Sequence, residues 1–162
     1  MQTDSTNHST EKRFANDQLM LELTRQLTDR GLVTRAQVDD LNSRCALTGE
    51  NIDRMLVKEQ IVAEDALLEV LAELTNIPFK HLAHIKIEPE AVKQVPARVA
   101  IRYNVMPLTF ENGMVTMAVN RVPAPSMVDG LRMLLNTTVD WILCTESDIN
   151  KSLKHFYGLG AD

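Results

Sequence analysis

This sequence contains an internal repeat of apolar residues. Residues 23–38 and 52–67 superimpose when the chain is shifted by 29 positions. The apolar residues that coincide are Leu23 with Ile52, Leu27 with Leu56, Leu32 with Ile61, Val33 with Val62, and Val38 with Leu67. A repeat of this length marks one supersecondary unit per copy, and two copies are too few for a solenoid. The repeat therefore predicts a small helical subdomain whose two halves pack on each other.

Each copy reads as a helix, a short turn and a second helix. Gly31 lies where the first helix should end, because glycine adopts the positive φ of a helix C-terminus without a Cβ penalty. Gln60 holds the matching position in the second copy, where positive φ costs a non-glycine residue about 1 kcal/mol. Thr34 and Gln37 form a capping-box pair for the next helix. The helices predicted after the first turn cover residues 35–46, 51–60 and 64–75.

The helix before the first turn carries an apolar stripe at helical spacing, beginning near Glu11. The stripe consists of Phe14, Leu19, Met20, Leu23 and Leu27. Two interpretations remain open at this point. The helix packs on its own domain, or it presents a docking surface to a partner protein, which is favoured by its first turns lying ahead of the repeat.

The pattern changes after Pro78, which disfavours helix in the residue before it. Asn112-Gly113 stands between two β-rich runs and is a strong hairpin signal. Predicted helices begin at Glu88-Pro89, where Pro96 interrupts the pattern, at Met127 after a Ser126 cap, and at Glu146 after a Thr145 cap. The predicted strands cover residues 79–82, 85–87, 105–110, 114–119 and 137–144.

These patterns together predict an α+β fold. An all-helical N-terminal subdomain, the doubled helix–turn–helix, precedes a small α/β sandwich with the order β-α-β-β-α-β-α. The predicted divisions are a disordered tail over residues 1–10, the helical subdomain over 11–76 and the α/β subdomain over 77–162.

Charge is distributed unevenly along the chain. Residues 1–78 contain 8 basic and 14 acidic residues, whereas residues 79–162 contain 9 and 8. This difference fits two subdomains with different surfaces, and the overall net charge of -5 argues against nucleic acid as a partner. Cys45 and Cys144 lie far apart with no CxxC motif, which indicates reduced thiols. No apolar run approaches the ~20 residues that cross a bilayer, so we expect a cytoplasmic chain that meets the membrane only indirectly.

The motifs of catalysis and cofactor binding are missing from the sequence. A P-loop requires a Gly-Lys pair, and none occurs. His81 and His84 are three residues apart in a strand-like stretch, where such residues point to opposite faces and cannot share a metal. Paired acids such as Asp39-Asp40 and Glu64-Asp65 fit solvated helix starts. We therefore expect no catalytic, cofactor-binding or metal-binding residue in this chain.

The ordered set of segments in the second half resembles the N-terminal domain of the type II secretion ATPases, which is shared with the type IV pilus assembly ATPases. The segments that carry the resemblance are residues 71–79, 95–98, 103–108, 113–119, 148–149 and 156–158. The resemblance implies a parent protein in which a hexameric ATPase core with Walker motifs follows. It also implies docking on the cytoplasmic domain of an inner-membrane platform protein.

Some members of this family bind cyclic di-GMP through the doubled module, and here the spacing of their motif is kept while its polar residues are lost. Four pairs of motif positions are substituted, in whole or in part: Glu22 and Asn51 for arginine, Thr24 and Asp53 for the first glycine, Gly31 and Gln60 for the second, and Cys45 and Leu74 for glutamine. Glutamate in place of arginine repels a dianionic ligand. The apolar frame of the motif survives at Leu23, Leu27, Val38, Ile52, Leu56, Leu67 and Leu71. Burial alone explains its retention, at roughly 1.5–3 kcal/mol for each side chain.

The sequence therefore predicts a non-catalytic docking or regulatory domain that couples a secretion or pilus assembly ATPase to its platform protein. The predicted docking residues are the stripe Phe14, Leu19, Met20, Leu23 and Leu27. The alternative is a cyclic di-GMP receptor with a degenerate doubled motif, for which we expect no binding of the dinucleotide.

Overall fold

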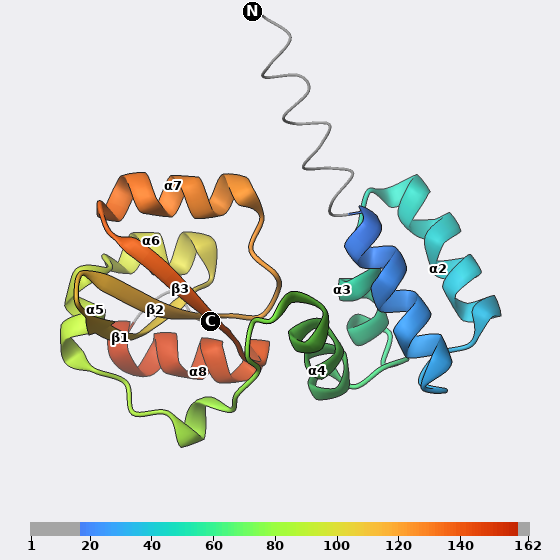
Figure 1. The fold of residues 1–162 in the computed structure, drawn as a ribbon, viewed down its shortest axis with the longest axis horizontal. Coiled ribbons are helices and arrows are strands. Elements are labelled where there is room, and N and C mark those ends of the chain that lie inside the picture. The colour runs from blue at the N-terminus through green and yellow to red at the C-terminus, as the bar shows by residue number, and fades with distance from the viewer. Residues whose placement is uncertain (1–16, 159–162) are drawn as a thin grey trace, which may run out of the picture. The chain divides into compact units, whose positions relative to one another are not determined.

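The computed structural model describes residues 17–158, so the predicted tail over residues 1–10 and the docking candidate Phe14 lie outside the described residues. The chain divides into two compact units, one ending at Leu74 and the other beginning at Thr75. The mixed fold predicted from the sequence, helical first and α/β second, is confirmed (Figure 1). Between residues 17 and 158, no helix combines the length and apolar character that crossing a bilayer would require.

The first unit contains a helix over residues 17–29 and the helices α2 (Arg35–Thr48), α3 (Ile52–Lys58) and α4 (Glu64–Thr75). The Thr34 capping box begins α2, because the Gln37 amide donates to the Thr34 hydroxyl and the Gln37 side chain accepts from the Thr34 amide. Gly49, at φ 77°, ends the same helix two residues later than predicted. The core is built from both copies: Leu23, Leu27, Val33, Leu41, Ile52, Met55, Leu56, Val62, Leu67, Leu68, Val70 and Leu71.

The two long helices after the turns differ in how much they bury. Helix α4 buries four apolar side chains, whereas α2 buries only Leu41. The α2 counterparts of Leu68 and Leu71 are Asp39 and Asn42, which are exposed. The second copy therefore supplies most of the buried apolar surface after the turn.

The second unit is a three-stranded sheet with helices around it. Its strands are β1 (Met106–Glu111), β2 (Met114–Val119) and β3 (Thr138–Leu143), in the order β1-β2-β3. β1 and β2 form the predicted hairpin, with Asn112 and Gly113 at φ 53° and 74° in its turn. β2 and β3 are parallel and are connected through α7 (Pro125–Leu135). Figure 1 shows α7 and the last helix, α8 (Glu146–Tyr157), on opposite sides of the sheet.

The remaining elements of this unit are a 3-10 turn, η1 (Leu82–His84), and two short helices, α5 (Pro89–Gln94) and α6 (Ala97–Tyr103). The predicted interruption at Pro96 thus separates α5 from α6. Tyr157, at the end of α8, donates a hydrogen bond to the carbonyl of Val95 at 2.9 Å and lies 3.3 Å from that of Val92. Burial raises the pKa of this phenol to about 12.

The first strand of the predicted order is reduced to a single bridge. Phe79 pairs in parallel with Leu143, and the predicted strand over residues 85–87 does not form. The backbone of the intervening residues turns instead, since the amides of His84 and Ile85 donate to the carbonyls three residues before them. The prediction that Ser126 caps the next helix was wrong, because α7 begins at Pro125 with Ala124 as its N-cap. Proline is well suited to the first helical turn, where its missing N–H is not needed.

Candidate functional site

The doubled module of the first unit repeats its backbone as well as its sequence. The Leu32 amide donates to the Leu27 carbonyl at 2.9 Å, and the matching Ile61 amide donates to the Leu56 carbonyl at 3.0 Å. The residue before each of these amides has positive φ, 74° at Gly31 and 59° at Gln60. The second turn therefore keeps the geometry of the first and bears the strain that the sequence predicted for Gln60.

Two crossed ion pairs connect the copies. Arg30 pairs with Glu73, and Arg44 pairs with Glu59 at 2.8 Å. The repeat offset places Arg30 opposite Glu59 and Arg44 opposite Glu73 in the alignment. Arg30 therefore pairs with the counterpart of Arg44, and Arg44 pairs with the counterpart of Arg30. Such a reciprocal exchange is typical of an interface with twofold symmetry. The first copy supplies both cations and the second supplies both anions.

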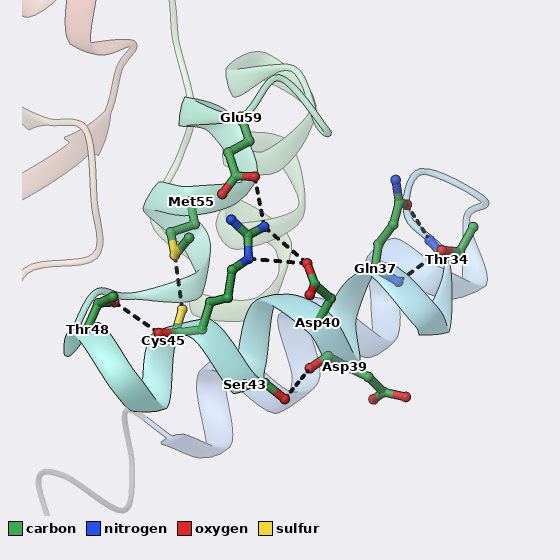
Figure 2. A network of polar contacts seen from close by, with 10 residues as sticks. Thr34, Gln37, Asp39, Asp40, Ser43, Cys45, Thr48, Met55 and Glu59 are labelled. Carbon is green, nitrogen blue, oxygen red and sulfur yellow. Dashed lines mark hydrogen bonds and ion pairs between the residues drawn. The ribbon is translucent and has the colours of Figure 1, made fainter.

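Arg44 connects Asp40 of α2 with Glu59 at the end of α3, two acids that Figure 2 labels within one polar network. Its guanidinium contacts Asp40 on its own helix at 3.2 Å as well as Glu59. The hydrogen bond to Glu59, together with the charges of Glu59 and Asp40, raises the pKa of Arg44 further. Beside it, the Cys45 sulfur lies 3.3 Å from the Met55 sulfur, and burial and the charge of Glu50 raise the pKa of the Cys45 thiol. Arg44 thus faces two carboxylates, and the raised pKa keeps the Cys45 thiol protonated near neutral pH.

The positions that would hold a dianionic dinucleotide are filled by other side chains. Thr24 and Asp53, at the first glycine positions, are both buried, with 7% and 4% of their surface exposed. The Thr24 hydroxyl donates to the Leu21 carbonyl at 3.0 Å. Glu22, at an arginine position, lies 3.5 Å from Arg25. Side chains thus occupy the space where the motif needs bare backbone, and a carboxylate stands where it needs a cation.

The predicted docking stripe divides into two parts in the structure. Leu23 and Leu27 are fully buried in the core of the first unit, whereas Leu19 and Met20 are half-buried. The interpretation that this helix packs on its own domain therefore accounts for Leu23 and Leu27. A docking surface on this helix would have to be made from Leu19, Met20 and their exposed neighbour Leu21, which has 58% of its surface exposed.

The apolar members of the motif also have assigned places. Leu56, Leu67 and Leu71 are buried, Val38 is half-buried, and Gly31 forms the first turn. These residues build the scaffold that their pattern predicted. The sequence comparison of apolar positions missed the crossed ion pairs, although the same shift of 29 residues aligns arginine with glutamate at both positions.

The described part of the second unit contains an open hollow. Within residues 17–158, no three His, Cys, Asp or Glu side chains gather as a metal site would require, and the rings of His81 and His84 are 6.2 Å apart. The hollow, of about 730 Å³, lies between α7 and the beginning of β3 and was not predicted. It is lined by Gly113, Asp129, Arg132, Met133, Asn136, Thr137 and Thr138. Cys144 is fully buried, and burial together with the charge of Asp148 raises its pKa to about 12.

Comparison with known proteins places the second unit in a family. The profile of the MshEN domain matches residues 75–162, more than half of the chain. The chain belongs to the MshEN domain family. The fold agrees with a structure of MshE with cyclic di-GMP, at a TM-score of 0.69 and 20% identity over 83% of this chain and 98% of that one. It agrees equally with the N-terminal domain of XpsE, at a TM-score of 0.69 and 17% identity over 86% and 96% of the two chains.

Curated relatives extend the same conclusion. The type IV pilus assembly ATPase PilB of Myxococcus xanthus is 23% identical over 81% of this chain, and bacteriophage adsorption protein B of Escherichia coli is 21% identical over 95%. The chain spans about a fifth of the length of these relatives. The resemblance to the N-terminal domain of secretion and pilus assembly ATPases is confirmed.

Proposed function

We propose that this chain is a docking and regulatory domain that couples a secretion or pilus assembly ATPase to the cytoplasmic domain of an inner-membrane platform protein. The observation that carries the proposal is the match of the MshEN domain over residues 75–162, which follows the helical unit in the same chain. In this proposal the domain works in the cytoplasm and reaches the membrane through its partner, and the ATPase core belongs to the same parent chain.

The surface of the first unit supports a protein partner. Residues 1–74 carry 8 basic and 14 acidic residues, and the acids Asp29, Asp39 and Glu69 are exposed with no ion pair to any residue between 17 and 158. Leu21, which follows the stripe residues Leu19 and Met20, is apolar and has 58% of its surface exposed on the same unit. Exposed acids on the same unit as an exposed leucine favour a partner that offers basic residues and an apolar contact.

Isothermal titration of the chain with the cytoplasmic domain of the cognate platform protein tests this proposal. We expect binding that a double substitution of Leu19→Ser and Met20→Ser weakens by at least tenfold. Leu47→Ser on α2 is the matched control and should leave the affinity unchanged. No binding at high micromolar concentration, with both proteins folded by circular dichroism, would refute the proposal.

The second candidate function is reception of cyclic di-GMP, which is favoured by the likeness to a structure of MshE with that ligand. The filled glycine positions and Glu22 oppose it, so we expect no binding in equilibrium dialysis below about 100 µM, a standard free energy weaker than roughly -5.5 kcal/mol. A variant with four substitutions should gain affinity for cyclic di-GMP if those positions hold the ligand. The substitutions are Glu22→Arg, Asn51→Arg, Thr24→Gly and Asp53→Gly. Micromolar binding by the unaltered chain would overturn the expectation.

A further inference from the structure

β3 has one edge that the rest of the sheet does not use. On one side it pairs with β2 along its whole length, from Thr138 to Leu143. On the other side, Leu143 alone is bonded: its amide donates to the Pro78 carbonyl at 2.8 Å and its carbonyl accepts from the Lys80 amide at 3.0 Å. The bridge therefore fixes which edge Leu143 faces, and it covers only the C-terminal end of that edge.

The backbone groups of Val139 and Trp141 face the same uncovered edge. Amide and carbonyl groups alternate between the two sides of a strand, so residues 139 and 141 share the side of Leu143. The Cys144 amide confirms this alternation, because it donates to Val119 on the β2 side at 2.8 Å. No backbone hydrogen bond within residues 17–158 reaches Val139 or Trp141 from the open edge. Two N–H and two C=O groups are thus available to an added strand.

The side chains of this edge oppose pairing between two copies of the chain. If two β3 strands paired antiparallel so that Val139 met Trp141 of the other copy, the two Asp140 side chains would lie directly opposite each other. Like charges in that position destabilise a sheet, and a charge in the middle of an edge strand is a known protection against self-association. Asp140 is exposed and has no ion pair with a described residue. Its carboxylate would favour a lysine or arginine in the same position.

We propose that the open edge of β3 accepts an extended segment of a partner protein, with a basic residue opposite Asp140 and β-branched residues on either side of it. Strand addition of this kind takes affinity from main-chain hydrogen bonds and specificity from alternate side chains. The bridge at Phe79 limits the added segment to the stretch beside residues 138–141, which is about four or five residues. The site lies in the second unit, so it does not depend on the docking function of the first.

The test is a titration of isotope-labelled chain with the peptide acetyl-Thr-Val-Lys-Val-Thr-amide, followed by nuclear magnetic resonance at peptide concentrations up to about 1 mM. The peptide reads the same in both directions, so its lysine faces Asp140 in either strand orientation. We expect shifts centred on residues 138–141 and slower amide exchange at Val139 and Trp141. The same peptide with all five backbone nitrogens methylated cannot donate to β3 in either orientation and should not bind.

Charge reversal provides the second part of the test. Asp140→Lys should lower the affinity for the lysine peptide by roughly fivefold, as expected for an exposed ion pair. The same variant should bind the peptide with glutamate in place of lysine more tightly than the unaltered chain does. Glu111→Lys, on the far strand β1, is the matched control and should change neither affinity. The proposal is overturned if the methylated peptide binds as well, if the shifts lie away from β3, or if no shift appears. Protection of Val139 that rises with protein concentration alone would also overturn it, in favour of a second copy as the occupant.

Discussion

Replacing Gln60 by glycine should stabilise the first unit, although it removes a side chain. Gln60 is exposed and sits at φ 59°, in the left-handed region. Gly31 holds the same place in the other copy at φ 74°, and a Cβ added there would meet no atom within 4 Å. The two turns therefore differ in backbone strain and not in packing.

The size of the effect follows from two opposing terms. Relief of the left-handed conformation is worth about 1–2 kcal/mol for a residue other than glycine. The greater freedom of glycine in the unfolded chain subtracts about 0.4–1 kcal/mol. A net stabilisation of about 0.5–1 kcal/mol remains for Gln60→Gly, and Gly31→Gln should cost a similar amount. For a unit of this size the change in Tm is roughly 2–8 °C.

Far-ultraviolet circular dichroism is the appropriate assay, because the first unit is all helix. The single tryptophan, Trp141, lies in β3, so its fluorescence reports the second unit and serves as an internal control that should not change. The double variant Gly31→Gln with Gln60→Gly exchanges the two turns and should return close to the stability of the unaltered chain. If Gln60→Gly lowers the stability, or if Gly31→Gln is neutral, the strain argument is refuted.

Three further outcomes are expected from denaturation of suitable variants. Arg44→Glu should lower the midpoint, and adding Glu59→Arg should recover much of the loss; no recovery would mean that the two residues do not interact. Leu56→Ala removes a fully buried side chain and should cost about 2–5 kcal/mol, whereas Leu47→Ala at an 87% exposed site should stay within about 0.5 kcal/mol. The pKa of Tyr157 is raised from 10.0 to about 12. Its contribution to the free energy of unfolding is therefore complete below about pH 10 and is lost as the pH rises through 12. Tyr157→Phe should lower the free energy of unfolding by about 1 kcal/mol at neutral pH. It should also remove the part of the stability loss between pH 10 and 12 that Tyr157 causes, and an unchanged loss of stability would contradict this role of Tyr157.

The elements that depend on local chemistry could be predicted from the sequence. Helix α4 follows the predicted range of 64–75, because its apolar spacing is continuous and acids begin it. The Thr34 capping box, the Thr145 cap and the Asn112-Gly113 turn each need only neighbouring residues to form. In each case the interaction that sets the geometry lies within four residues of the residue that signals it.

The features that were missed depend on residues far apart in the chain. Phe79 forms a bridge because Leu143 passes beside it, and no property of residues 79–82 determines how long that contact lasts. The burial of Leu23 and Leu27 depends on how the helices of the first unit pack together, so their apolar character alone could not separate core from docking surface. The crossed pair of Arg44 and Glu59 required both the repeat offset and the packing of the copies to be known.

The segregation of charge between the two copies has a consequence for how this module can evolve. An event that copied one segment onto the other would give both copies the same residues at these positions. Here such an event would set arginine against arginine, or glutamate against glutamate, at both crossed contacts at once. A charge reversal at any one of these four positions leaves a like-charge contact until its partner is reversed as well. The two copies are thus no longer interchangeable, because one supplies both cations and the other supplies both anions.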